Sequence, residues 1–432
     1  CFIHSAFQSN DAWPYDWSEF CAASVYTYVP DDNFEQALID LGYDDVLNDS
    51  VLTANISGVT TLDVSNDSIS DLTGIEGFTA LTYLNCHDNQ LTTLDVSNNT
   101  ALTNLGCGYN QLTSLDVSNN TALTELDCQY NGLITLDVSN NIALTVLSCW
   151  NNELTSLDVS NNTALTGLNF HHNQLTSLDV SSNTALTYLN CIYNDLTSLD
   201  VSSNTALTDL RCNNNELDSL DVSNNTALTA LFCYNNSIDS LDVSSNTALT
   251  SFHCGNNQLT SLDVSANTSL SSLTCWSNQL TSLDVSNNTS LMTLGCSSND
   301  LNVLDVSNNT ALSQLYCDNT SLTSLDVSVN TALTILYCMD NELTYLNMRN
   351  GITDGLTNFS ATGNSLTCIE TLDPDYATTN WTYANGNIDE GVTFAVDCLL
   401  GPPPPPPFVD NAFFQTYGGS EHEYGLAVQQ TS

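Results

Sequence analysis

A 21-residue pattern of apolar and polar positions runs through most of this 432-residue chain. One unit, Leu102 to Ala122, reads LTNLGCGYNQLTSLDVSNNTA, and Leu-Asp-Val-Ser occurs 13 times between Leu62 and Ser328. A fixed period of about 20 to 29 residues is typical of a solenoid, because a single coil cannot bury its own apolar edge. The pattern therefore predicts stacked coils.

Within each coil, the alternation of apolar and polar residues predicts one short strand. Leu105 and Cys107 are expected to point inward, while Gly106 and Gly108 face the open side. Asn110 and its equivalents are expected to form an internal ladder whose amides bond backbone groups at a tight turn. Too few residues remain for a full helix behind the strand, so extended or 3₁₀ segments are expected there.

The unit resembles the leucine-rich repeat family, because it matches L-x-x-L-x-L-x-x-N-x-L with cysteine in place of the third leucine. The resemblance covers roughly residues 59–369. It implies a β-rich solenoid, a rod or arc of about 15 coils and on the order of 70 Å long. The coils are expected to be closed by a short N-terminal helical cap and a disulfide-closed C-terminal cap.

The two ends of the solenoid carry a second, finer resemblance. VPDDNFEQALIDLGYDD, ISDLTGIEGFTALTYLNC, CIETLDPDYATTNWT and NIDEGVTFAVDC look like the ends of secreted leucine-rich repeat proteins of Bacteroidetes bacteria. This resemblance implies export and surface display and brings no catalytic residues. The chain departs from it in having no lysine, which such proteins usually carry.

Five segments are expected along the chain. They are an N-terminal segment with a capping helix (1–58), the solenoid (59–369), a C-terminal cap (370–400), a polyproline linker (401–407) and a strand-like tail (408–432). Asn33 and Gln36 have capping-box spacing, and Phe34, Ala37, Leu38 and Leu41 make one apolar helix face. The tail either begins a truncated further domain or adds a strand to a neighbouring molecule.

The sixteen cysteines fall into two groups. Twelve occupy the strand position, with Phe170 interrupting the column: Cys86, Cys107, Cys128, Cys149, Cys191, Cys212, Cys233, Cys254, Cys275, Cys296, Cys317 and Cys338. Neighbours about 4.8 Å apart exceed the Cβ separation that a disulfide prefers, which favours buried free thiols over a metal-binding ladder. Cys1 with Cys21, and Cys368 with Cys398, flank the two ends, where disulfides would indicate an oxidising, extracellular location.

The net charge of the chain limits the classes of partner that it can bind. The chain has 2 basic and 49 acidic residues, a net charge of −47, so nucleic acid and anionic membrane surfaces are excluded as partners. The sequence contains no run of about 18 apolar residues, so membrane insertion is not expected. A hydrophobic content of 41% with strong periodicity indicates an ordered solenoid rather than acidic disorder.

Aromatic residues gather at the outward strand positions and in the turn that follows. The candidate ligand-binding residues of this concave face are Tyr109, Tyr130, Trp150, Tyr188, Tyr193, Phe232, Tyr234, Trp276, Tyr316 and Tyr337. Such a stripe either stacks on sugar rings or anchors a protein, or it only packs coil against coil. His171 and His172 are expected to point apart, as consecutive strand residues do.

A column of aspartates follows from the Leu-Asp-Val-Ser repeat. Neighbouring charges about 5 Å apart repel by on the order of 1 kcal/mol even in water. Hydrogen bonds from nearby Ser and Thr, bound cations such as Ca²⁺, or raised pKa values would each offset this, and hydrogen bonding is favoured. The weak calcium candidates are Asp116, Asp137, Asp158, Asp179, Asp200 and Asp221.

Asn-Asn-Thr triplets follow these aspartates. The first asparagines are acceptor candidates for N-glycosylation in a eukaryotic secretory route, although the same triplets are ordinary turn chemistry. These candidates are Asn98, Asn119, Asn161, Asn224, Asn287 and Asn308.

No nucleophile triad, phosphate loop, clustered metal-ligand motif or paired-carboxylate site stands out from the repeats, so an enzyme is not expected. Two functions from different classes remain. The first is recognition and adhesion at the cell surface or in the extracellular space, with a glycan or protein bound to the aromatic face. The second is a structural protomer that forms a homopolymer, an extracellular filament or sheath. The varied aromatic stripe favours recognition.

Overall fold

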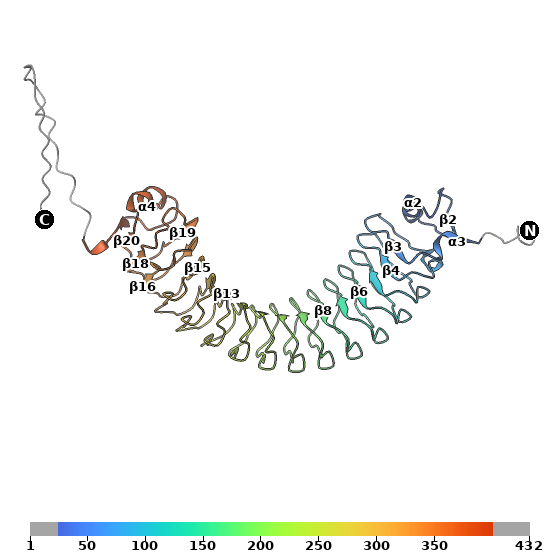
Figure 1. The fold of residues 1–432 in the computed structure, drawn as a ribbon, viewed down its shortest axis with the longest axis horizontal. Coiled ribbons are helices and arrows are strands. Elements are labelled where there is room, and N and C mark those ends of the chain that lie inside the picture. The colour runs from blue at the N-terminus through green and yellow to red at the C-terminus, as the bar shows by residue number, and fades with distance from the viewer. Residues whose placement is uncertain (1–24, 401–432) are drawn as a thin grey trace, which may run out of the picture.

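The computed structural model describes residues 25–400, which form a parallel β-solenoid bent into an arc (Figure 1). The strands lie along the inner, concave side of the arc, and the returning segments form its outer side (Figure 1). Apart from β16 between β15 and β17, and β18 between β17 and β19, neighbouring strands of this sheet are consecutive in sequence. The predicted fold class is confirmed.

The main sheet has 15 parallel strands of three residues each. They are β3 (Thr61–Asp63), β4 (Tyr83–Asn85), β5 (Asn104–Gly106), β6 (Glu125–Asp127), β7 (Val146–Ser148), β8 (Gly167–Asn169), β9 (Tyr188–Asn190), β10 (Asp209–Arg211), β11 (Ala230–Phe232), β12 (Ser251–His253), β13 (Ser272–Thr274), β14 (Thr293–Gly295), β15 (Gln314–Tyr316), β17 (Ile335–Tyr337) and β19 (Asn358–Ser360).

Each coil places equivalent residues directly beside one another. Leu210 pairs with Leu189 on one side and Leu231 on the other, and all three are fully buried. Behind the strands the chain returns through turns, such as the one in which the Asn120 N–H donates to the Val117 carbonyl at 3.0 Å. A single 3₁₀ turn, η2 (Ile75–Gly77), lies in the first coil. The coils therefore share one continuous apolar core.

Two asparagine ladders run through this core. In the predicted ladder, Asn257 Nδ2 donates to the carbonyls of Cys233, Cys254 and Gly255, and its Oδ1 accepts from the Ile238 N–H. The second ladder, which the sequence reasoning treated only as a turn, contains Asn267 and its equivalents. Each of its amide nitrogens donates to two carbonyls of the preceding coils. Both ladders join neighbouring coils through buried hydrogen bonds.

The cysteine column lies beside these ladders. All twelve column cysteines are buried free thiols, as predicted, and Phe170 fills the gap in the column. Burial raises the pKa of Cys86, Cys149, Cys212 and Cys275 to about 12. The thiolate, which is the reactive form, is therefore scarce in the folded chain.

We expect the column to resist alkylation while the chain is folded. Iodoacetamide at pH 8 should leave the column of a Cys1→Ser, Cys21→Ser variant unmodified without reductant, whereas 6 M guanidinium should expose all twelve thiols. Intact mass measures the number of adducts. Rapid labelling of several column thiols in the native chain would contradict this burial.

The N-terminal cap covers the first coil. Its elements are β1 (Tyr26–Tyr28), α2 (Asp32–Asp40), β2 (Ser50–Leu52), which pairs antiparallel with β1, and α3 (Thr53–Ile56). Phe34 and Leu38 of α2 are fully buried, and the Phe34 ring lies 6.5 Å from that of Phe78. The helix thus closes the open end of the core.

Two details of the predicted helix are wrong. The N-cap is Asp31, whose Oδ1 accepts from the N–H groups of Asn33 and Phe34, so Asn33 lies inside the helix. Leu41 is 46% exposed and does not belong to the buried face. Asp31 takes the cap because its Oδ2 also accepts from Ser70 and Asp71 of the solenoid, which holds it in place.

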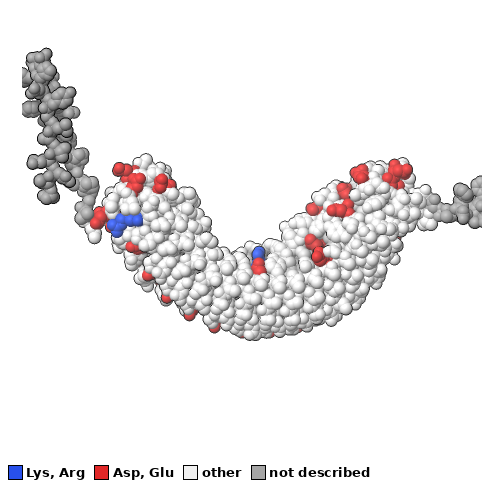
Figure 2. Space-filling view, in the orientation of Figure 1, with Lys and Arg blue, Asp and Glu red and all other residues white. Residues whose placement is uncertain are grey.

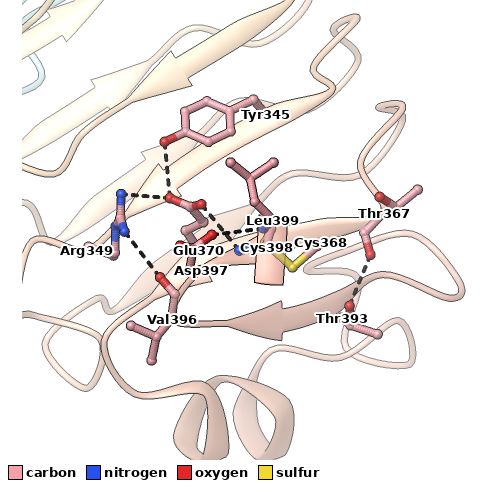
Figure 3. Close-up of a disulfide and its surroundings, with 10 residues drawn as sticks. All are labelled: Tyr345, Arg349, Thr367, Cys368, Glu370, Thr393, Val396, Asp397, Cys398 and Leu399. Carbon is pink, nitrogen blue, oxygen red and sulfur yellow. Dashed lines mark hydrogen bonds and ion pairs between the residues drawn. A yellow bond between two sulfur atoms is a disulfide. The ribbon is translucent and has the colours of Figure 1, made fainter. Parts of the chain in front are cut away.

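The C-terminal end is closed by a smaller parallel sheet. It contains β16 (Ser324–Asp326), β18 (Tyr345–Met348), β20 (Cys368–Thr371) and β21 (Thr393–Ala395), and is joined by α4 (Pro374–Asn380) and η3 (Cys398–Leu400). The predicted disulfide between Cys368 and Cys398 is present (Figure 3). The other predicted disulfide, Cys1 with Cys21, lies outside the described residues, as do the 401–407 linker and the 408–432 tail.

Across residues 25–400, every helix is too short or too polar to span a membrane.

Candidate functional site

Six rings make a continuous contact series on the concave side, which we call the aromatic ladder: Tyr109, Tyr130, Trp150, His171, His172 and Tyr193. Tyr109 stacks on Tyr130 with ring centroids 4.3 Å apart, and Trp150 stacks on His171 at 4.4 Å. His172 stacks on Tyr193, also at 4.4 Å. Five consecutive coils contribute to this surface.

The backbone under the ladder is unusual. Tyr109, Tyr130, His172 and Tyr193 have φ values of 52°, 48°, 54° and 51°, in the left-handed region. The same position in the other coils holds Asn, Asp or Ser: Asp88, Asn151, Asn214, Asn235, Asn256, Ser277, Ser298, Asn319 and Asp340. Bulky residues at such positions cost of order 1–3 kcal/mol each and concentrate at functional sites. The ladder rings are therefore not required by the coil itself.

The two ladder histidines differ from the prediction. His171 and His172 were expected to point apart, but their ring centroids lie only 5.2 Å apart. The backbone of His172 has a φ of 54°, in the left-handed region, so the alternation of side chains along the strand has ended before this residue. Burial, followed by the charge of His172, lowers the pKa of His171 to about 4. His171 is therefore a neutral ring at neutral pH.

The remaining predicted aromatic residues form other groups. Tyr188 and Phe232 flank Arg211, whose guanidinium carbon lies 5.7 and 5.2 Å from their ring centroids. Tyr316 and Tyr337 are neighbours with centroids 5.7 Å apart. Tyr234 and Trp276 lie outside the ladder, in the turn that follows β11 and β13 respectively. The ring contacts thus fall into three groups, namely the ladder, the pair around Arg211, and Tyr316 with Tyr337.

The strands of the concave face are almost neutral from β7 to β19. From β7 to β19, the only Asp, Glu, Lys or Arg residues in the strands of the main sheet are Asp209 and Arg211. These two pair with each other at 2.9 Å. Figure 2 shows the charged residues gathered towards the two ends and along the outer edge, with the concave side largely white. From β7 onward the strands beside the aromatic rings therefore carry little charge, whereas Asp88 and Asp127 lie near Tyr109 at the N-terminal end of the ladder.

At the N-terminal end of the ladder, one histidine spans three coils. The His87 ring fills the space above Gly106 and Gly108, where a Cβ would collide with it. Its Nε2 lies 3.2 Å from Asp127 Oδ2, and its ring centroid is 6.3 Å from that of Tyr109. The hydrogen bond to Asp127 raises the pKa of His87 above its ordinary value of 6.5.

Asp127→Asn is expected to return the His87 pKa towards 6.5 and to lower the free energy of unfolding by up to about 1 kcal/mol, because the pair is partly exposed. The raised pKa means that this stabilisation is complete below pH 6.5 and is lost as the pH rises through the folded-state pKa. NMR titration and urea unfolding at several pH values measure both effects. Glu125→Gln, on the same strand, is the control. An unchanged His87 pKa in Asp127→Asn would contradict the pairing.

The aspartate column faces solvent, as predicted. In each candidate from Asp116 to Asp221, Oδ1 accepts from the backbone N–H of the serine two residues later, at 2.9 Å. The Ser118 side chain and backbone N–H lower the pKa of Asp116, and the other five follow the same pattern. These hydrogen bonds therefore offset part of the repulsion between neighbouring carboxylates. Calcium binding by the column stays a prediction.

Within residues 25–400, the carboxylates that do converge are those of Asp32, Glu35 and Asp49 in the N-terminal cap. Glu35 is fully buried, and its carboxylate accepts from the N–H groups of Asn48, Asp49 and Ser50. This carboxylate therefore anchors the loop before β2.

The six glycosylation candidates are all exposed. Five of them, from Asn119 to Asn308, donate from Nδ2 to a serine carbonyl of the preceding coil at 3.2 to 3.4 Å. Glycosylation stays a prediction.

Comparison with known proteins identifies relatives of the chain. No protein-family model matches it. Internalin J of Listeria monocytogenes serotype 4b (strain F2365) is 40% identical over 76 residues, 18% of this chain and 8% of that protein. The chain thus matches only a small part of that relative's length.

Solved structures match over a longer region. The functional domain of InlJ from Listeria monocytogenes, which includes a cysteine ladder, aligns with a TM-score of 0.75 at 39% identity, covering 82% of this chain and 78% of that chain. An internalin (inlF) from Listeria monocytogenes strain 4b F2365 gives 0.62 at 26% identity, over 75% and 94%. The finer resemblance to Bacteroidetes proteins stays a prediction. On the repeats, the solenoid and these relatives, the chain belongs to the leucine-rich repeat family.

Proposed function

We propose that this chain is a non-enzymatic recognition protein that binds a protein or glycan ligand through the aromatic ladder. The observation that carries the proposal is the run of contacting rings, four of which, Tyr109, Tyr130, His172 and Tyr193, stand at left-handed backbone positions. Asparagine takes these positions elsewhere in the solenoid, so the coil has a less strained choice available. Rings retained at a conformational cost support a binding role.

The exposure and rigidity of the ladder support the same role. Tyr109 and Tyr130 are each 39% exposed, and Tyr193 is 50% exposed. The rings are held by mutual stacking, so they lose little conformational entropy when a ligand binds. Exposed, pre-ordered aromatic residues are typical of binding hot spots.

An extracellular or cell-surface location fits the proposal. The internalin relatives share the fold, and the Cys368–Cys398 disulfide favours an oxidising compartment. Export and surface display are therefore part of the proposed function.

The test compares two matched tyrosines. Tyr130→Asn removes a ladder ring and introduces the residue that the next coil already has there, Asn151. Tyr83→Asn removes an equally exposed tyrosine, 39%, from β4, and its next coil has Asn104 at that position. Both variants should fold, because each new residue already occupies the equivalent place in a neighbouring coil.

The full chain is first screened against arrays of extracellular protein domains and of glycans. For a ligand found there, Tyr130→Asn should weaken binding about thirty-fold, equivalent to about 2 kcal/mol, as for a hot-spot residue. Tyr83→Asn should bind like the unmodified chain. Equal binding by both variants, or equal weakening in both, would remove the ladder as the site.

The filament alternative, with joints at the solenoid ends and in the 408–432 tail, stays a prediction, and the tail lies outside the described residues. Sedimentation velocity of the full chain would distinguish single solenoids from filaments by their size.

A further inference from the structure

A groove crosses the concave face at β14, away from the aromatic ladder. Its main lining residues are Thr274, Trp276, Gly295, Ser297, Tyr316 and Asp318. The cavity volume is about 360 Å³. The walls come from β13 and β15 and the turns after them, and these strands flank β14 directly, so the groove is one strand wide.

Gly295 is buried at the floor of the groove, with the Thr274 side chain beside it and no covering ring above it. Two other outward glycines are covered, Gly255 by the indole of Trp276 and Gly108 by His87 and Gln129. The three atoms nearest to a Cβ placed on Gly295 all belong to Thr274 beside it, the first at 3.3 Å. Gly295 is not in the left-handed region, so its backbone does not require glycine. A side chain at position 295 would enter the groove, so glycine keeps the groove free.

The groove combines aromatic walls with hydrogen-bonding groups. The Trp276 side chain forms part of one wall and is 36% exposed, and Tyr316 forms part of the other. Ser297 Oγ donates to Asp318 Oδ1 at 2.7 Å, while Asp318 Oδ2 has no partner within residues 25–400. A sugar ring presents C–H groups that pack on aromatic rings and hydroxyl groups that donate to a carboxylate.

Charge selects among ligand classes. β13, β14 and β15 contain no charged residue, so nothing in these strands attracts an anionic group. A cation would find Asp318 and Trp276, but it would meet a strand face whose only charges in β7 to β19 are the mutually paired Asp209 and Arg211. Apart from Asp318, the residues that line the groove are uncharged, and its aromatic walls and hydroxyl groups suit a neutral ligand rich in hydroxyl groups.

From this lining we propose that the Gly295 groove binds one neutral sugar ring of a glycan. The proposal rests on the proposed function in one respect, that the concave face is the recognition surface. The groove and the aromatic ladder share no residue, so each can fail without the other.

The experiment uses the full chain and a panel of soluble neutral oligosaccharides, with cello-, malto-, xylo- and chito-oligosaccharides as the probes, measured by calorimetry and saturation-transfer NMR. Gly295→Thr fills the groove with a residue suited to a strand, after a small shift of the Thr274 side chain, whose Cγ2 lies 3.3 Å from the new Cβ. Gly167→Thr is the control, because a Cβ on Gly167 of β8 meets only Val146, at 3.9 Å or more. Gly295→Thr is expected to weaken binding at least ten-fold, and Gly167→Thr and Tyr83→Asn to leave it unchanged.

Two further outcomes would overturn the proposal. The first is that no probe binds at millimolar concentration, or that Gly295→Thr binds as well as the unmodified chain. The second is selectivity for a cation, tested with tetramethylammonium chloride. Asp318→Asn retains an oxygen acceptor for hydroxyl groups, so sugar binding should fall less than ten-fold. If instead tetramethylammonium binds, displaces the sugars and is lost in Asp318→Asn, the groove is a cation site.

Discussion

Asn257→Ala is expected to lower the free energy of unfolding by about 2 to 4 kcal/mol, since a buried group left without a partner costs about 1 to 3 kcal/mol and the other lost hydrogen bonds add to this. The change leaves the N–H of Ile238 without a hydrogen bond among the described residues, while the carbonyls of Cys233 and Cys254 keep only the amides of Asn236 and Asn278. Alanine also leaves a small cavity between coils. This position therefore holds two neighbouring coils together.

The effect should be local to that junction. In a solenoid each coil contacts its neighbours only, so stability is a sum of coil and interface terms. Weakening one interface lets the shorter C-terminal block unfold before the rest. Urea unfolding followed by far-UV circular dichroism should therefore show a lower midpoint and a broader or two-step transition.

Gln258→Ala is the matched control, because it removes an exposed amide from the next residue. It is expected to change the free energy of unfolding by no more than about 0.5 kcal/mol. Asn267→Ala should fall between the two. The amide of Asn267 donates two hydrogen bonds, but its Oδ1 has no partner within residues 25–400. A loss in Asn257→Ala no larger than in Gln258→Ala would mean that the ladder does not hold the coils together.

The coil could be predicted from sequence because near-identical repeats report their own constraints. Leu105 and Cys107 point inward as expected, and the ladder of Asn110 is present. The second ladder also has a sequence signature. The residue before Asn204 is Ser203, and the one before Asn267 is Ala266, whereas the second position stays asparagine in every coil from Asn99 to Asn330. Constancy beside variation indicates a buried role.

The candidate site was harder to predict than the coil. The aromatic positions could be read from the sequence, but which rings meet depends on backbone conformation. Strand alternation predicts that His171 and His172 diverge, and the left-handed φ of His172 brings them together. The Gly295 groove depends on the absence of a covering ring, and sequence spacing does not show that Trp276 covers Gly255 instead. Both features arise from contacts between coils.

Removing the Cys368–Cys398 disulfide is expected to produce the second large effect. The bridge closes a chain segment with a sequence separation of 30 residues, and the chain-entropy model assigns about 3 to 4 kcal/mol to a loop of that length. It links β20 to the end of the cap, where the solenoid core would otherwise be open. A Cys368→Ala, Cys398→Ala variant should therefore lose that amount of stability in the last coils.

The surroundings of the disulfide make the loss specific. Glu370 is only 3% exposed and accepts from Tyr345 Oη at 3.1 Å and from the Cys398 N–H at 3.3 Å, and it pairs with Arg349 at 2.9 Å (Figure 3). When the bridge is removed, Cys398 no longer holds its N–H against this carboxylate. Part of the compensation for a buried charge is then lost along with the covalent link.

Hydrogen exchange separates a local effect from a global one. Amides of β20 and β21 should exchange faster in the double variant, while those of β5 to β8 should keep their protection, because distant coils are not in contact. Leu399→Ala, which changes a 93% exposed neighbour and leaves the bridge intact, should match the unmodified chain. Uniform loss of protection along the solenoid would mean that the cap is coupled to every coil, which nearest-neighbour stacking does not allow.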